Sequence, residues 1–312
     1  MIGIRSGLAR MARSRVARRL ALWLALSLAL PGLLIPGFWP GLLSTASPDY
    51  VFGEHHAAPW GVLALCLAWL WLKREQIRVQ LDAKEQVLPI LVGLALVVGA
   101  SFLPASSDWA AFQGLLVALG ALLIVSGRLV RLPAVALGVY GFAVFFPILV
   151  DRFAADSYVG LASGPLLALL TALGYPIASQ GGWIQIPSLS GQAIQVVVTA
   201  ACAGPATMAV FVSLFALMML DVPLPPGRAV GLFLFGVVGT WLQSFLRLVY
   251  LLLTGYYLGE GALWTLHSYS IYIVFPLWYL IFAWLYFRMV GGPARRGMSR
   301  IQSASENGTR GG

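Results

Sequence analysis

Long apolar runs separated by short polar loops dominate the sequence. A helix that crosses a bilayer needs about 20 mostly apolar residues, and most of these runs come close to that length. They predict membrane-spanning helices near residues 20–39, 57–72, 87–104, 108–127, 132–150, 205–222, 229–255 and 268–290. The hydrophobic pattern therefore predicts an all-α polytopic integral membrane protein with about eight transmembrane helices.

Two segments between the fifth and sixth predicted spans have a different character. Residues 158–177 are apolar and long enough to cross, but they contain glycine and proline. We interpret this segment as a helix that lies on, or dips into, the outer membrane face. Residues 178–200 mix Gly, Ser, Pro and Gln with short alternating or β-branched runs, a pattern typical of an extended or hairpin-like segment. This segment delivers the chain to Cys202.

Composition agrees with the hydrophobic pattern. Apolar residues make up 60% of the 312-residue chain and charged residues only 10%, with a mean hydropathy of +0.86. Soluble domains have about 25% charged residues, so the composition excludes an ordinary soluble domain. The net charge of +9 arises from basic residues at the N-terminus, between spans and in the tail. Such clusters contact anionic lipid, so we expect a lipid bilayer and no nucleic acid as partner.

Charge in the loops predicts the orientation of the chain. The loop "KREQIRVQLDAKEQ" carries four basic residues and "GRLVR" carries two, whereas "SPDYVFGEHHAAP" and "PASSD" carry none. Basic loops stay on the cytoplasmic side. The alternation therefore predicts that both termini are cytoplasmic and that Cys202 lies on the extracytoplasmic side.

The two ends of the chain complete this organisation. Arginines before the run 20–39 and the following "LSTAS" also fit a cleavable signal peptide, but the length of the run favours a retained span. The polar, glycine-rich C-terminal end is predicted to be disordered. We expect one multi-span membrane domain over 1–290, with its site region at 183–290, and a disordered cytoplasmic tail over 291–312.

Arg247 is the exceptional ionisable residue within the predicted spans. Arginine at the membrane centre costs roughly 2.5–3.5 kcal/mol on insertion scales, so such a residue points to function. The alternative is that its long side chain reaches back to the interface. A helix rises about 1.5 Å per residue. By this measure the helix after Cys202 crosses inward, the next helix crosses back to bring Arg247 to nearly the same depth, and the last helix begins at that depth with His267. The three residues are therefore predicted to meet at the outer rim.

These residue types suit nucleophilic chemistry. A thiol becomes a good nucleophile when nearby cations favour the thiolate, and Arg247 and a protonated His267 would both do so. The positive end of a helix that starts near Pro205 would add to this effect. His267 would pass a proton to a leaving amine, and Arg247 would hold a substrate carbonyl, oxyanion or carboxylate. Gly204 would let a substrate backbone approach Cys202 closely.

The sequence resembles the exosortase/archaeosortase family of polytopic membrane cysteine transpeptidases over its whole eight-span layout, most sharply over 183–290. The resemblance rests on an extended segment leading into "ACAG", an arginine in "SFLRLVY" and a histidine in "LHSYSIYIVF". It implies that Cys202 is the nucleophile, Arg247 the essential arginine and His267 the third catalytic residue.

Some family positions hold other residues, which marks this chain as a divergent branch. Ala203 follows the cysteine where the family commonly has serine, Ser244 stands where asparagine is common, and Ile271 replaces a common glycine. We expect Gly204, Gln243 and Ser244 to contribute to substrate binding.

The resemblance also implies a protein-sorting reaction. A thiol protease of this kind would cleave C-terminal sorting signals of exported proteins, each made of a short motif, a membrane helix and a basic tail. A thioester intermediate would then pass the protein to a cell-surface acceptor. The enzyme would lie in the cell membrane with its site outside, and it would need no cofactor and no metal.

Two other functions stay open at this point. A non-catalytic transporter or assembly factor for cell-surface polymers would use Arg247 to bind an anionic substrate, with Gln243 lining its path. An acyl- or glycan-transferase would use the outer-loop residues Glu54, His55 and His56, which with Asp49 also raise the question of a metal. Adjacent histidines point in different directions on any regular element, so no defined metal site is predicted.

Overall fold

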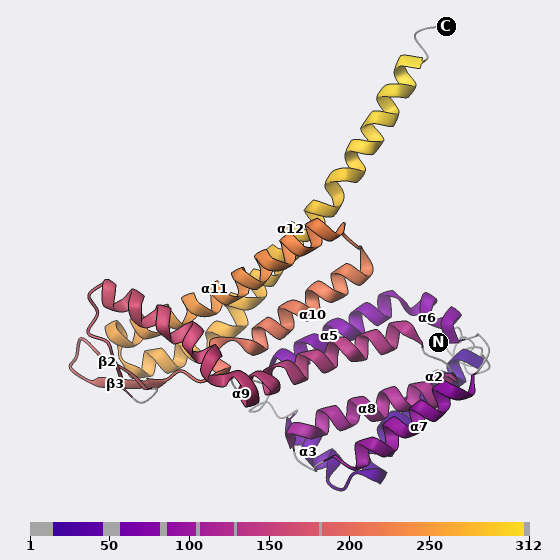
Figure 1. The fold of residues 1–312 in the computed structure, drawn as a ribbon, viewed down its shortest axis with the longest axis horizontal. Helices are drawn as coiled ribbons and strands as arrows, with labels where there is room; N and C mark the ends of the chain where they lie inside the picture. The colour runs from indigo at the N-terminus through magenta and orange to yellow at the C-terminus, as the bar shows by residue number, and fades with distance from the viewer. Residues whose placement is uncertain are drawn as a thin grey trace, which may run out of the picture. The chain divides into compact units, whose positions relative to one another are not determined.

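The computed structural model describes residues 15–45, 57–81, 86–103, 107–127, 130–180 and 183–308. The chain divides into two compact units between Ile148 and Leu149. The first unit contains α2 Arg15–Leu34, α3 Phe38–Thr45, α5 Ala57–Leu72, α6 Arg74–Leu81, α7 Val87–Ser101 and α8 Ser107–Ser126. Helix α9 Arg131–Ala172 runs from the first unit into the second. The elements that follow it are β1 Ala178–Gln180, β2 Trp183–Pro187, β3 Ala193–Val197, the 3₁₀ turn η1 Ala201–Ala203, α10 Pro205–Asp221, α11 Pro226–Leu258 and α12 Glu260–Gly308 (Figure 1).

Each apolar run of the sequence is largely helical, and the run 20–39 is divided between α2 and α3. By length and composition, the helices able to cross a membrane within the described ranges are Ala17–Leu34, Arg131–Ala172, Pro226–Leu258 and Glu260–Val290. Shorter apolar helices cover Trp60–Leu72, Val87–Ser101, Phe112–Ser126 and Pro205–Asp221. The all-α polytopic membrane class is therefore confirmed. The number of crossings and the cytoplasmic position of the termini stay predictions.

Small residues hold α7 and α8 together in the first unit. A Cβ atom added to Gly93 would lie 2.6 Å from the Gly120 carbonyl oxygen, and one added to Gly120 would lie 2.6 Å from that of Gly93. Helices that pack in lipid use such residues to bring their backbones close, because the hydrophobic effect gives no preference for a helix over a lipid tail.

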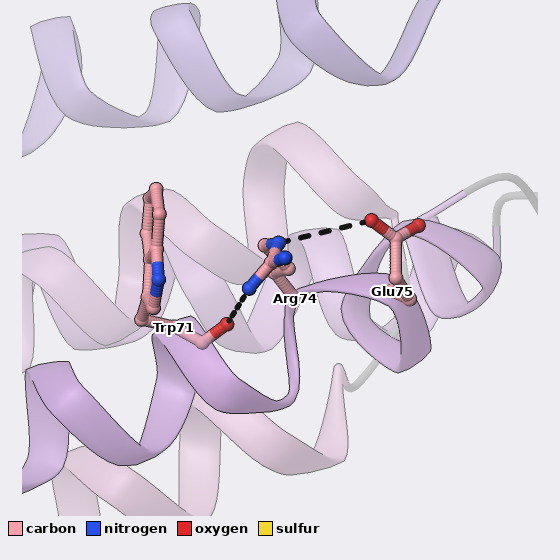
Figure 2. Close-up of polar contacts among 3 residues, drawn as sticks. All are labelled: Trp71, Arg74 and Glu75. Atoms are coloured by element: carbon pink, nitrogen blue, oxygen red, sulfur yellow. Dashed lines mark hydrogen bonds and ion pairs between the residues drawn. The ribbon is translucent and has the colours of Figure 1, made fainter.

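A local polar cluster marks the end of α5, within the basic loop of the sequence (Figure 2). Arg74 Nη1 donates to the Trp71 carbonyl at 3.1 Å, and Arg74 Nε lies 3.9 Å from a Glu75 carboxylate oxygen. The guanidinium carbon is 5.0 Å from the centroid of the Trp71 ring. An exposed ion pair contributes only about 0–1 kcal/mol, so the main effect of Arg74 is to satisfy a C-terminal helix carbonyl.

Helix α9 contains the break that the sequence predicts. The sequence predicts a span ending near residue 150 and a separate helix over 158–177, and α9 consists of two helical stretches that meet at a kink at Ala154 (φ −141°, ψ 16°), the second of which ends at Ala172. Beyond this kink, Leu166 and Leu170 are fully buried in the cluster that also contains the strands. Packing within the second unit therefore fixes the second helical stretch, and its predicted position on the outer membrane face stays a prediction.

The structure confirms the extended, hairpin-like segment that precedes Cys202. Strands β1, β2 and β3 form an antiparallel sheet in that order. Alternation places Ile184, Ile186 and Ile194 on one face, where each is at least 98% buried. This face packs with residues of α9, α11 and α12, so the sheet is fixed to the helices of the second unit.

Helix α12 continues to Gly308, within the segment 291–312 for which the sequence predicts a disordered cytoplasmic tail. The disorder of this tail and its cytoplasmic position stay predictions.

The close contact of α7 and α8 makes a testable prediction about stability. Gly93→Ala should lower the thermal unfolding midpoint in detergent, because overpacking a close contact costs about 1–3 kcal/mol. Gly99→Ala on the same helix is the matched control, since a Cβ there would meet no atom within 4 Å. Equal midpoints for the two variants would contradict glycine-mediated packing.

Candidate active site

Cys202 lies in a short turn between the sheet and a membrane helix. It is the middle residue of η1, between β3 and α10, and its thiol is free and partly buried. The Thr199 hydroxyl donates to Cys202 Sγ at 3.4 Å, and the Cys202 N–H donates to the Thr199 carbonyl at 3.0 Å. Thr199 therefore fixes both the backbone and the sulfur of Cys202.

Gly204 determines how α10 starts after Cys202. Its φ of +97° is in the left-handed region, which glycine adopts without steric cost. A Cβ here would collide with Ser244 Oγ and would lie 3.0 Å from both Ser244 Cβ and Thr207 Oγ1. The missing side chain thus lets α10 approach α11. The sequence does not indicate this packing role, and the predicted approach of a substrate at Gly204 stays a prediction.

Arg247 and His267 form a buried pair between α11 and α12. Their exposed fractions are 5% and 6%, and that of the neighbouring Ser270 is 3%. Arg247 Nη2 lies 3.2 Å from His267 Nδ1 and donates to the His267 carbonyl at 3.2 Å, while Arg247 Nε donates to Ser270 Oγ at 2.9 Å. Ser270 in turn donates to the His267 carbonyl at 3.2 Å. The two helices are therefore joined at this point by a fork of hydrogen bonds.

The contact between Arg247 and His267 assigns the histidine tautomer. Guanidinium nitrogens only donate hydrogen bonds, so His267 Nδ1 must accept and the ring proton must be on Nε2. The ring in this arrangement is neutral. In this arrangement the buried Nε2 carries the ring proton and is a hydrogen-bond donor, and the protonated His267 that the sequence suggested stays a prediction.

Packing brings the Cys202 turn to the helices that carry this pair. Cys202 and Ala203 pack in one cluster with Leu248, the residue after Arg247, and with Leu263, one turn before His267. Ser244, which contacts Gly204, lies one turn before Arg247 on the buried face of α11. Turn η1, the middle of α11 and the start of α12 thus converge in the second unit.

The other two predicted substrate residues make contacts inside the helix bundle. Ser244 Oγ donates to the Thr240 carbonyl at 3.1 Å and lies 3.4 Å from Thr207 Oγ1. Gln243 Nε2 donates to the Val274 carbonyl of α12. Both side chains therefore join helices to one another, and their predicted part in substrate binding stays a prediction.

The comparison with protein families identifies the chain. The transmembrane exosortase family model (Exosortase_EpsH) matches residues 53–284, which include Cys202, Arg247 and His267. The chain belongs to the transmembrane exosortase family. No curated protein and no solved structure matches it. The match confirms the family resemblance and gives this exosortase a membrane transpeptidase-like role in general terms.

Sequence reasoning about this exosortase missed two polar residues of the candidate site. Ser270 lies three residues after His267, so both share one face of α12. Thr199 lies three residues before Cys202, where a hydroxyl reaches the turn that follows. Each would have been found by asking which polar side chains stand one turn from a candidate catalytic residue.

The structure gives no support to a metal centre in the part of the chain that it describes. Asp49, Glu54, His55 and His56 lie outside the described residues. Within the described ranges, no three His, Cys, Asp or Glu residues form a group able to hold a metal ion.

The contact at Gly204 predicts a specific loss of stability in this exosortase. Gly204→Ala should lower the free energy of unfolding through left-handed strain, about 1–2 kcal/mol, and overpacking against Ser244, about 1–3 kcal/mol. Gly191→Ala is the control, since Gly191 also has positive φ (+85°) but open space around it. Denaturant titration of the purified variants measures both, and an equal loss in the two would argue against the contact with α11.

Proposed function

We propose that this exosortase is a cysteine transpeptidase whose nucleophile is Cys202. The observation that supports this most is the buried Arg247–His267 pair, packed in the same part of the second unit as the Cys202 turn. A buried arginine in a membrane protein is costly and marks a functional site by default. The family match over Cys202, Arg247 and His267 supports the same assignment.

The reaction proceeds in two steps. Cys202 Sγ attacks the carbonyl carbon of a substrate peptide bond, the C–N bond breaks, and a thioester forms between the substrate acyl group and Sγ. The thiol proton ends on the leaving amine. An acceptor nucleophile then attacks the thioester carbonyl, the C–S bond breaks, and the acceptor's proton restores the thiol. Covalent catalysis of this kind replaces one difficult step by two easier ones.

His267 and Arg247 have distinct roles in this proposal. The His267 Nε2–H donates a hydrogen bond to the oxyanion that develops on the carbonyl oxygen, a role that suits a neutral imidazole. Arg247 acts through His267, because its guanidinium holds His267 Nδ1, the His267 carbonyl and Ser270 Oγ. Arg247 is thus a positioning residue. The oxyanion-binding role that the sequence suggested for Arg247 is thus assigned to His267 in this proposal.

The substrates in this proposal are exported proteins anchored in the same membrane. Each carries a C-terminal signal of a short motif, a membrane helix and a basic tail, and the product is transferred to a surface acceptor. The site lies on the extracytoplasmic side of the cell membrane, where such a motif emerges from the bilayer. A site at the end of an apolar helix suits a substrate that is itself held at the membrane.

The transporter alternative receives less support from the contacts. It requires Gln243 to line a polar path beside Arg247, but the Gln243 amide is bound to the Val274 carbonyl of the neighbouring helix. Arg247 is 95% buried and holds His267. Because its guanidinium donors are already used in this way, Arg247 is poorly suited to bind a transported anion.

Removing the thiol tests the proposal directly. Cys202→Ala should abolish cleavage of a tagged, membrane-anchored test protein that the wild type processes, because the nucleophile is lost. Cys66→Ala, which removes the chain's other thiol, should retain activity. Neutral hydroxylamine added to the wild type should release the trimmed protein as a hydroxamate, as expected of a thioester. Processing by Cys202→Ala at the wild-type rate would overturn the proposal and favour a transporter or assembly factor.

The fork of Arg247 gives a second prediction. Arg247→Lys should lower kcat by roughly 10–100-fold with little change in KM, because an ammonium group cannot reproduce the fork, and each hydrogen bond from a charged donor contributes about 1.5–3 kcal/mol. Arg288→Lys is the matched control, since Arg288 stacks on Trp284 away from the pair. A rise in KM at unchanged kcat would contradict a positioning role and indicate direct substrate binding.

A further inference from the structure

The sheet beside Cys202 ends in a free strand edge. Strand β3 is the last strand of the order β1-β2-β3, and it pairs with β2 along Ala193–Val197. Among the residues that the structure describes, no backbone hydrogen bond joins the other side of β3 to a further segment. An edge strand of this kind presents N–H and C=O groups to any extended chain that reaches it.

The pairing pattern indicates which backbone groups face the free edge. The Ser188 N–H donates to the Gln192 carbonyl at 2.7 Å, which sets the alternation of the antiparallel ladder. By this alternation Ile194 and Val196 bond to β2, and the backbone groups of Gln195 and Val197 point away from it. Pro187, which has no N–H, pairs with Ala193 at a position that needs none.

The sequence of β3 lacks the usual protection of an edge. Natural edge strands carry charges, prolines or bulges that prevent further pairing. The strand "AIQVV" has no charge, no proline and no glycine, and Val197 on its open face is 38% exposed. Its composition is that of a strand that accepts a partner.

The free edge leads directly to the candidate nucleophile. Thr199, whose hydroxyl contacts Cys202 Sγ, is two residues beyond the end of β3. We propose that the extended segment preceding the membrane helix of the substrate adds to β3 as a fourth strand, parallel to it, and so brings its scissile bond to Cys202. This inference rests on the proposed function and identifies how the same site binds its substrate.

The path of the exosortase chain favours the parallel direction. The chain passes from β3 through Cys202 into helix α10 within the residues Val197–Pro205. A substrate made of an extended segment followed by a membrane helix runs in the same order. Parallel to β3 it places its strand on the edge, its cleavage point after Val197 and its helix next. Main-chain hydrogen bonds would then provide affinity largely independent of side chains.

A proline substitution on the edge tests this inference. Gln195→Pro removes an outward N–H without removing a bond to β2, and sheets tolerate proline at edges. It should lower kcat/KM for the tagged test protein by about tenfold, which corresponds to the loss of one hydrogen bond and adjacent pairing. The matched control Gln195→Ala keeps the N–H and should stay within about twofold. The alkylation rate of Cys202 by iodoacetamide should be the same in both, which shows that the site is intact.

Disulfide cross-linking gives an independent measurement if the proline variant does not fold. Val197→Cys is placed in a Cys66→Ala, Cys202→Ala background, and single cysteines are scanned along the extended segment of the test protein. Cross-linking should be strong at every second position. With Gln195→Cys instead, the strongest position should move two residues toward the substrate N-terminus. Uniform yields, or movement in the opposite direction, would overturn the parallel strand.

The outcomes separate this inference from the proposed function. If Cys202→Ala still processes the test protein, the transpeptidase proposal fails and the inference falls with it. If Cys202→Ala is inactive while Gln195→Pro keeps the wild-type kcat/KM, only the strand-addition inference is overturned.

Discussion

The contact between Arg247 and His267 is the interaction on which the candidate site depends. An arginine in the middle of an apolar helix costs roughly 2.5–3.5 kcal/mol on insertion scales. Hydrogen bonds from a charged donor contribute about 1.5–3 kcal/mol each, and Arg247 makes bonds to His267 Nδ1, the His267 carbonyl and Ser270 Oγ. The sum of such bonds offsets the cost, but only while α11 and α12 stay together. The cation therefore ties the stability of the helix pair to the orientation of the histidine ring.

Other polar contacts spread the same constraint over α10, α11 and α12. The Tyr279 hydroxyl donates to the Thr207 carbonyl at 2.8 Å, and Trp278 Nε1 donates to Thr240 Oγ1 at 3.0 Å. Interhelical hydrogen bonds in membrane proteins average about 0.6 kcal/mol each. They contribute less energy than the Arg247 fork, but they fix the rotation of each helix. Because α12 is hydrogen-bonded to both α10 and α11, the position of the Cys202 turn is fixed relative to the Arg247–His267 pair.

The sequence identifies the chemistry of this site better than its geometry. Arg247 is recognisable because a cation in an apolar run is costly, and the similar helix lengths around it predict that Cys202 and His267 lie at its level. Local pattern does not identify the partner of a side chain. The glycine at 204 fits both substrate approach and helix contact. Its contact with Ser244 on a neighbouring helix is visible only in the structure, and its part in substrate binding stays a prediction.

The fold agrees with the sequence where burial reinforces the local pattern. The break that the sequence predicts between residues 150 and 158 corresponds to the kink at Ala154, and the helical stretch beyond it is fixed because Leu166 and Leu170 pack against the sheet. Likewise, the alternating pattern of 178–200 predicts its sheet correctly because one face of each strand is buried.

The position of the Cys202 turn follows from anchors on both of its sides. Before it, Ile194 is buried under the sheet, and the loop that joins β2 to β3 is bound to α11 by the bond from the Leu189 N–H to the Tyr256 carbonyl at 2.9 Å. After it, Gly204 seats the start of α10 against Ser244. A short turn held at both ends has little freedom left to lose when a substrate binds. The Cys202 thiol would therefore reach a substrate carbonyl without a rearrangement of the backbone. Such preorganised positioning of a nucleophile contributes most to the rate of the chemical step.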